Sequence, residues 1–130
     1  MEFELRTPTR ECLVDITQEV AEALARTRIR DGLCTVYVPH TTAGVTINEN
    51  ADPDVCRDIV AFLGELVPRR WPYHHAEGNS DAHVKASLMG SAAQVPVTAG
   101  KLALGTWQGI FFAEFDGPRT RQVQVTVIAG

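Results

Sequence analysis

The 130-residue sequence lacks several features that define large classes of proteins. It has no apolar run near the ~20 residues that a membrane-spanning helix needs. Its first residues also lack the charged and apolar regions of a secretory signal peptide, so we expect a cytoplasmic protein with no membrane partner. No linker, repeat or low-complexity segment divides the chain. We therefore expect one domain over residues 1–130.

Cysteine and positive charge are also scarce. The three cysteines, Cys12, Cys34 and Cys56, are odd in number and show no Cys-x-x-Cys spacing. They are therefore typical of small buried apolar residues in a reducing compartment rather than of a disulfide framework. The 12 Lys and Arg residues against 16 Asp and Glu residues give a formal net charge of −4. This balance argues against nucleic acid as a partner, because phosphate-backbone binding depends on a positive surface.

Alternating segments and helix signals predict an α+β fold, an antiparallel β-rich sandwich with about three helices. The first two strands are expected to form a hairpin around residues 7–10, and the last strands to form antiparallel meanders around the turns at 98–100 and 116–118. The predicted strands cover residues 3–6, 11–14, 33–38, 44–47, 94–97, 101–104, 109–115 and 122–128. The predicted helices cover residues 16–28, 53 to about 67, and 82–89.

Capping residues mark where the helices begin. Asp15 is expected to cap the first helix, with Gln18 completing a capping box. Asp52, which precedes a proline, is expected to cap the second helix, and Asp81 can cap the third. Two apolar stripes at helical spacing are expected to lie in the core. They are Ile16, Val20, Ala23 and Leu24 in the first helix, and Val55, Ile59, Phe62, Leu63 and Leu66 in the second.

Three of the four histidines occupy positions from which they could reach one metal ion. Strand alternation puts His40 on the apolar face of its strand, beside Val38. His75 and His83 flank the glycine turn at residues 77–81. Three neutral imidazoles from separate segments form the ligand set of a catalytic zinc site, which leaves one position open for water or substrate.

The spacing alone does not settle this assignment. A single histidine is more often a surface or hydrogen-bonded structural residue than a ligand. His74 and His75 are adjacent and point opposite ways in an extended segment, so only one of them can serve. Strand parity does not choose between the two.

Other polar residues could complete a site. Residues 78–81 lead straight into the third predicted helix, so its N–H groups and dipole favour an anion, with Lys85 nearby. Alternatively, Asp81 caps the helix and occupies those donors itself. Glu49 shares its strand parity with Ile47 and is the candidate acid or base, since a carboxylate beside a metal can exchange a proton near neutral pH. The plainer alternative for Glu49 is a solvated carboxylate.

The strand at 109–115 has polar ends on an otherwise apolar face. Gln108 and Glu114 stand at those ends, an arrangement typical of a pocket wall. A strand-edge charge is the alternative for Glu114. Trp107 lies between two glycines, which indicates a bulge or close backbone approach, and packing or a subunit contact is its expected role.

Four segments together resemble the YjbQ-like family, also called secondary thiamine-phosphate synthases. They lie in order along almost the whole chain: His40–Ala43, Thr46–Asp54, Glu77–His83 and Gly105–Ile110. The resemblance implies an α+β homotrimer with a metal-bearing pocket near the subunit boundary. It also selects His75, rather than His74, as the ligand beside His40 and His83. The family's polar positions fall on Glu49, Asp52, Asn79, Asp81, Gln108 and Glu114.

The resemblance implies a transferase that joins hydroxymethylpyrimidine diphosphate to thiazole phosphate and releases diphosphate. The main barrier is charge separation as diphosphate leaves, so a divalent metal, a helix N-terminus and Lys85 are suitable groups to stabilise it. We expect Glu49 and Lys85 to be catalytic, Asp52, Asn79, Asp81, Gln108 and Glu114 to bind a small phosphorylated metabolite, and the metal to be zinc, with magnesium as the alternative when diphosphate is bound. Two other functions would use the same site. One is a metal-dependent hydrolase in which Glu49 activates water, and the other is a non-catalytic trimeric module that binds a phosphorylated ligand.

Overall fold

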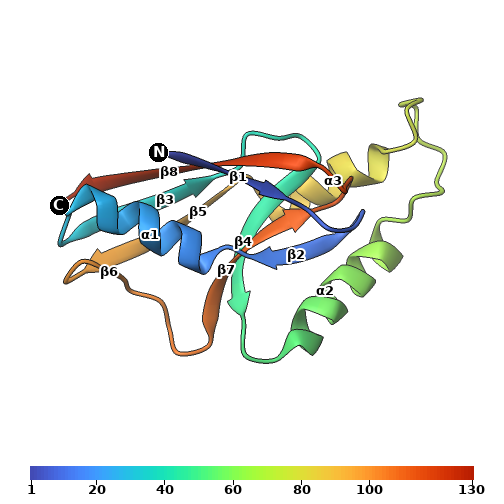
Figure 1. Cartoon of the computed structure of the whole chain (residues 1–130). Coiled ribbons are helices and arrows are strands. Elements are labelled where there is room, and N and C mark those ends of the chain that lie inside the picture. The colour runs from blue at the N-terminus through green and yellow to red at the C-terminus, as the bar shows by residue number, and fades with distance from the viewer.

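The computed structural model describes residues 1–130 and contains eight strands and three helices (Figure 1). The strands are β1 (Glu2–Arg6), β2 (Cys12–Asp15), β3 (Gly32–Tyr37), β4 (Ala43–Glu49), β5 (Ala92–Thr98), β6 (Lys101–Leu102), β7 (Gln108–Glu114) and β8 (Thr120–Ala129). The helices are α1 (Thr17–Thr27), α2 (Pro53–Leu66) and α3 (Ser80–Met89). The α+β class, the antiparallel sandwich and the three predicted helices are confirmed.

The strands form two sheets, one with the order β1-β8-β3-β5-β6 and one with the order β2-β7-β4. The predicted hairpin of the first two strands is wrong, because β1 pairs with β8 while β2 pairs with β7. The predicted meander from β7 to β8 is wrong for the same reason, since the chain crosses between sheets at residues 116–118. The hairpin of β5 and β6 is confirmed. A short turn between two alternating segments does not specify whether the chain doubles back or crosses to the facing sheet.

The main core lies between the two sheets and is closed by α1. The predicted stripe of the first helix is confirmed, because Ile16, Val20, Ala23 and Leu24 are at most 4% exposed. On the other face of β7, Ala113 and Phe115 pack against Ala82 and Ala86 of α3. Strand β7 is therefore covered on both faces. This arrangement makes it the central element of the fold.

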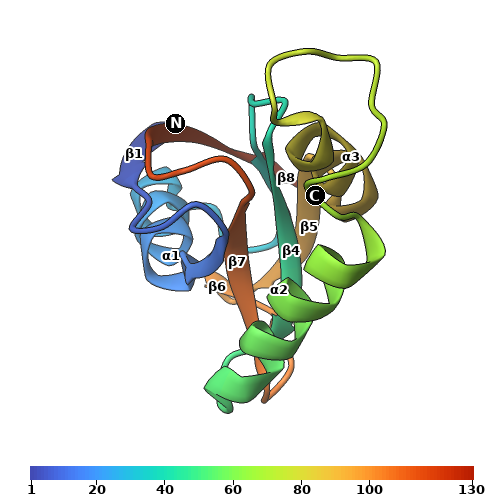
Figure 2. The same cartoon turned by 90° about the vertical axis from the view of Figure 1, so that its right-hand side faces the viewer.

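The apolar stripe of the second helix lies only partly against the core, which corrects the prediction: Val55, Ile59 and Leu63 are half-buried, and Leu63 packs against the cluster of Ala113 and Phe115. No residue of α2 is buried; Phe62 is 66% exposed and Leu66 is 58% exposed. Figure 2 shows α2 and α3 on the side of the molecule opposite α1. Helical spacing identifies an apolar face correctly, but it does not identify what covers that face. None of the three helices combines the length and the apolar character that a membrane crossing requires.

The helix starts follow the predicted caps in part. Asp52 caps α2 by accepting a hydrogen bond from the backbone N–H of Asp54 at 2.9 Å. Asp15 accepts hydrogen bonds from the N–H and the hydroxyl of Thr17 at 2.9 and 2.6 Å, so it holds the start of α1. Gln18 bonds along the helix instead of back to the cap, so the predicted capping box is wrong.

Candidate functional site

A polar depression lies between residues 39–43, α3 and the turn that leads into β8. It consists of two pockets that share His40, Thr41 and His83. The helix lobe has a volume of about 480 Å³ and is bordered by Ala86, Ser87 and the segment at 90–91. The arginine lobe has a volume of about 390 Å³ and is lined mainly by polar side chains. Beyond the shared residues, its polar lining is Thr42, Glu77, Asn79, Asp116, Arg119 and Arg121.

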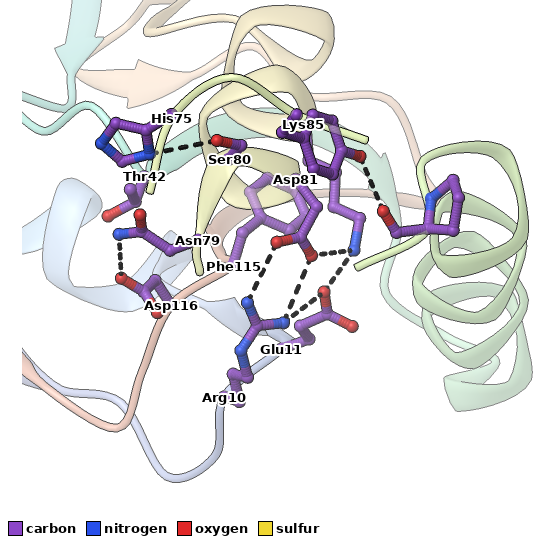
Figure 3. Close-up of polar contacts among 12 residues, drawn as sticks. Arg10, Glu11, Thr42, His75, Asn79, Ser80, Asp81, Lys85, Phe115 and Asp116 are labelled. Carbon is purple, nitrogen blue, oxygen red and sulfur yellow. Dashed lines mark hydrogen bonds and ion pairs between the residues drawn. The ribbon is translucent and has the colours of Figure 1, made fainter. Parts of the chain in front are cut away.

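Two of the predicted ligands stand together beside this depression. The rings of His75 and His83 have centroids 5.4 Å apart and are nearly perpendicular, at 79°. Two imidazoles on one tetrahedral zinc ion, with Zn–N bonds of about 2 Å, have centroids about 5 Å apart. The Nδ1 atom of His75 lies 3.0 Å from the hydroxyl of Ser80 (Figure 3). This pair therefore has a spacing compatible with sharing an ion.

The third predicted ligand is engaged elsewhere. The Nε2 atom of His40 accepts a hydrogen bond from the backbone N–H of Gln122 at 2.9 Å, which places the ring proton on Nδ1. No group of three or more His, Cys, Asp or Glu side chains is positioned to hold a metal ion. The predicted three-histidine set is thus not assembled in this structure, and His40 would have to give up its bond to Gln122 to bind a metal through Nε2.

The protonation state of His40 does suit a ligand. Burial of the ring lowers the pKa of His40, and the positive charge of Arg121 lowers it further. The imidazole therefore stays neutral to a lower pH than an ordinary histidine does. A neutral ring nitrogen is the form that binds a metal.

The predicted site residues divide between the two ends of β4. In the register of β4 and β7, Ala43 is opposite Glu114 and Glu49 is opposite Gln108. Strand β4 has seven residues, so its ends lie roughly 20 Å apart. Glu49, Gln108 and Asp52 therefore lie at the far end from the histidines. Within one chain, Glu49 cannot exchange a proton with a group bound there.

Lys85 and Asp81 belong to a buried cluster of ion pairs. The side chain of Lys85 is 2% exposed, and its ammonium lies 3.1 Å from Asp81 and also contacts Glu11. Asp81 is fully buried and pairs with Arg10 at 3.2 Å (Figure 3). Burial alone would raise the pKa of Asp81, but hydrogen bonds from Arg10 and Lys85 outweigh it and hold that pKa below its usual value.

This cluster gives both residues a structural place that sequence reasoning did not predict. Helix α3 begins at Ser80 with Asn79 at its cap position, so Asp81 lies inside the helix and does not cap it. Lys85 does not line either lobe and is not available to a departing phosphate. The i,i+4 spacing of Asp81 and Lys85 could have indicated their pairing, whereas Arg10 and Glu11 gave no local signal.

Glu114 is also committed to the fold rather than to a ligand. It is fully buried, forms an ion pair with Arg121 and accepts hydrogen bonds from Thr7 and the backbone N–H of Asp116. Burial raises the pKa of Glu114, but the bonds from Arg121 and Thr7 outweigh burial and lower it overall. Arg121 donates as well to the hydroxyl of Thr42 at 2.9 Å. The pair thus links the β1–β2 and β7–β8 connections to Thr42 in the wall of the depression.

Asn79 is the one predicted substrate residue that lines the depression. Its amide nitrogen donates to Asp116 at 2.9 Å, which fixes the orientation of the amide (Figure 3). The opposite atom, Asn79 Oδ1, is buried and has no hydrogen-bond partner. Arg119 and Arg121 of the same lobe were missed from sequence, although their i,i+2 spacing along a strand would place them on one face.

Comparison with known proteins identifies the family. The sequence profile described as "UPF0047 protein YjbQ-like" matches residues 1–130. The chain belongs to the YjbQ family. It is similar to a UPF0047 protein of Methanocaldococcus jannaschii, with 54% identity over 97% of this chain and 91% of that protein. It is also 48% identical to YugU of Bacillus subtilis over 97% and 96% of the two chains.

Solved structures of YjbQ relatives share the fold. An uncharacterised conserved protein of the YjbQ/UPF0047 family from Clostridium acetobutylicum has a TM-score of 0.97 and 54% identity, covering 98% of this chain and 99% of that one. A hypothetical protein from Aeropyrum pernix has a TM-score of 0.95 and 40% identity, covering 100% and 98%. The family resemblance and the YjbQ-like fold are therefore confirmed.

The Glu114–Arg121 pair generates a stability prediction. Glu114→Gln leaves the buried guanidinium of Arg121 without its counter-charge, and we expect the free energy of unfolding to fall by about 3–5 kcal/mol. The exposed Glu22, replaced by Gln as a control, should change it by no more than about 0.5 kcal/mol. Denaturant unfolding measures both. A Glu114→Gln protein as stable as the control would show that the pair does not hold the fold.

Proposed function

We propose that this YjbQ-family protein is a cytoplasmic, metal-dependent enzyme that acts on a small phosphorylated metabolite and binds zinc through His40, His75 and His83. The observation that carries the proposal is the position of His83. His83 borders both lobes of the depression, as His40 does. His75 is the third imidazole because its ring lies beside that of His83.

The residues fit a zinc ion in chemistry, with one adjustment. Imidazole nitrogens suit zinc, and the Ser80 hydroxyl can fix the ring of His75 through Nδ1, which leaves Nε2 for a metal. His40 would join as the third ligand by exchanging its bond to Gln122 for the metal. A divalent ion bound there would stabilise negative charge that develops on a departing phosphate or diphosphate.

Formation of thiamine phosphate with loss of diphosphate is the specific reaction that we propose. Family resemblance implies it, and the departure of diphosphate needs positive groups of the kind that surround the histidines. The chain's own contribution would be to bind the phosphate in the polar depression and to orient the organic part. The hydrolase alternative has less support, because Glu49, its expected base, lies at the other end of β4. The growth test below distinguishes the proposed reaction from the alternative of a non-catalytic binding module.

We also propose that the protein assembles as a homotrimer. Helices α2 and α3 leave an apolar groove open between them, with a volume of about 360 Å³. Its walls include Phe62 at 66% exposure and Leu88 at 60%. An exposed apolar surface of this kind is typical of a subunit contact. The number three comes from the family resemblance.

The assembly prediction concerns Phe62. Light scattering of the wild-type protein should give about three times the chain mass of 14.2 kDa. Phe62→Asp puts a charge into the apolar contact and should shift the mass towards the monomer. Ile128→Asp, at an equally exposed residue on β8, should leave the mass unchanged. A monomeric wild type would contradict the trimer, and a trimeric Phe62→Asp protein would contradict this interface.

The activity prediction concerns His83. Expression of the wild-type chain should restore growth without thiamine to a bacterium that lacks its principal thiamine-phosphate synthase. His83→Ala should abolish this rescue, because it removes a metal ligand and with it the stabilisation of the departing diphosphate. His74→Ala is the matched control, since His74 is exposed and adjacent to the ligand His75; it should rescue like the wild type.

Two other outcomes would count against the proposal, and a further measurement would then choose between the alternatives. Full rescue by a folded His83→Ala protein would contradict the metal-dependent mechanism. Failure of the wild type to rescue would contradict thiamine-phosphate synthesis. If that wild type still bound phosphorylated ligands only with metal, a hydrolase or a binding module would be the better account.

A further inference from the structure

Two arginines present unused hydrogen-bond donors to the arginine lobe. Arg119 donates from Nε to the backbone carbonyl of Asp116 at 2.7 Å and from Nη2 to its carboxylate at 2.9 Å, which leaves Nη1 without a protein partner. Arg121 uses Nε and Nη2 for Glu114 and Thr42, and its Nη1 is likewise unpaired.

The free nitrogen of Arg121 belongs to a side chain that lines the lobe. The side chain of Arg121 is only 5% exposed, yet the one buried side-chain nitrogen or oxygen without a partner is Asn79 Oδ1. Nη1 of Arg121 is therefore not fully buried, and Arg121 is one of the residues that line the arginine lobe. A guanidinium held this firmly by Glu114 is a pre-positioned donor, because little of its freedom remains to be lost on binding.

The acidic groups of the lobe do not offer a matching site for a cation. Asp116 Oδ2 already accepts from Asn79 and Arg119 at 2.9 Å each. Glu114 is neutralised by Arg121. Glu77 stands at the rim with 76% of its side chain exposed, 3.7 Å from His75. The two free guanidinium nitrogens of the lobe are donors, which favour an anion, and the unpaired acceptor of the same lobe, Asn79 Oδ1, is an uncharged amide oxygen.

We propose that the arginine lobe is a phosphate-binding subsite in which Nη1 of Arg119 and Nη1 of Arg121 hold the phosphate oxygens. A tetrahedral phosphate presents several oxygens and can accept from two guanidinium groups at once. The volume of about 390 Å³ exceeds the needs of one phosphate and leaves room for the group that carries it. Because His40 and His83 also line this lobe, the bound phosphate would lie beside the histidines.

This subsite takes the role that sequence reasoning gave to Lys85, whose ammonium is buried elsewhere. The identification of the ligand as a phosphorylated metabolite rests on the proposed function. The binding of phosphate itself requires no metal and no turnover, so the two proposals can fail separately.

The test is isothermal titration of chelator-treated, metal-free protein with inorganic phosphate and with diphosphate at constant ionic strength. The wild type should bind both saturably. Arg119→Gln should weaken binding by about tenfold or more, as expected when a charge-assisted hydrogen bond is lost. Arg119→Lys keeps the charge but not the planar donor pair, and its affinity should fall between the two.

The matched control is Arg57→Gln. Arg57 forms an i,i+3 ion pair with Asp54 at 2.9 Å, as Arg119 does with Asp116 at the same distance, but it lies on α2 outside the lobe. The Arg57→Gln substitution removes the same charge as Arg119→Gln does and should leave phosphate binding unchanged. The thermal midpoint of each variant confirms folding, and Arg119→Lys replaces Arg119→Gln if the latter unfolds.

Any of three results would overturn the proposed subsite. The wild type could show no saturable binding of phosphate, or both folded Arg119 variants could bind phosphate as tightly as the wild type. The third result is an equal loss of phosphate affinity in the Arg119 and Arg57 variants. If the wild-type protein binds phosphate but does not restore growth without thiamine, the result would instead count against the proposed reaction and leave the subsite standing.

Discussion

The buried ion pair between Glu114 and Arg121 is the interaction on which the candidate site depends. Two charges taken out of water are tolerated only when their remaining hydrogen bonds are satisfied. Glu114 meets this condition through Thr7 and two backbone N–H groups, and Arg121 meets it in part through Thr42. These partners come from the connections between β1 and β2, between β3 and β4, and between β7 and β8. The residue after Arg121 holds His40 through its backbone N–H.

A second ion cluster fixes the opposite wall. Arg10 and Glu11, in the connection between β1 and β2, meet Asp81 and Lys85 on α3. Helix α3 begins immediately after the segment that carries His75 and bears His83 in its first turn. The position of His83 therefore depends on residues more than 70 positions away along the chain. The two clusters thus lie behind opposite walls of the depression, one beside His40 and the other on the helix that carries His83.

Local patterns predicted most elements but not their partners. Alternation and helical spacing found every strand, all three helices and the buried face of α1, since these depend on neighbours in sequence. They could not decide that β1 pairs with β8 or that Phe62 faces outward, because both depend on distant surfaces.

The candidate site was predicted unevenly for the same reason. His40, His83 and Asn79 do border one depression, and His75 lies beside His83. Lys85 and Asp81 were given chemical roles because their buried partners, Arg10 and Glu11, are remote in sequence. Glu49 was grouped with the histidines although strand length separates them. The sequence did not indicate a role for Arg119 and Arg121, because they lie in a turn and at the polar start of a strand, which are ordinary surface features.

The central claim is that His40, His75 and His83 bind one metal ion beside the polar depression. Its most direct test is a zinc titration of the wild-type protein, followed through the imidazole nitrogen resonances of all four histidines. The account predicts that the three ligand histidines change together and saturate at one zinc per chain. It also predicts a change at the Gln122 amide, as His40 exchanges its hydrogen bond for the metal, and none at His74. Absence of saturation, or a response from His74 in place of His40, would contradict the account.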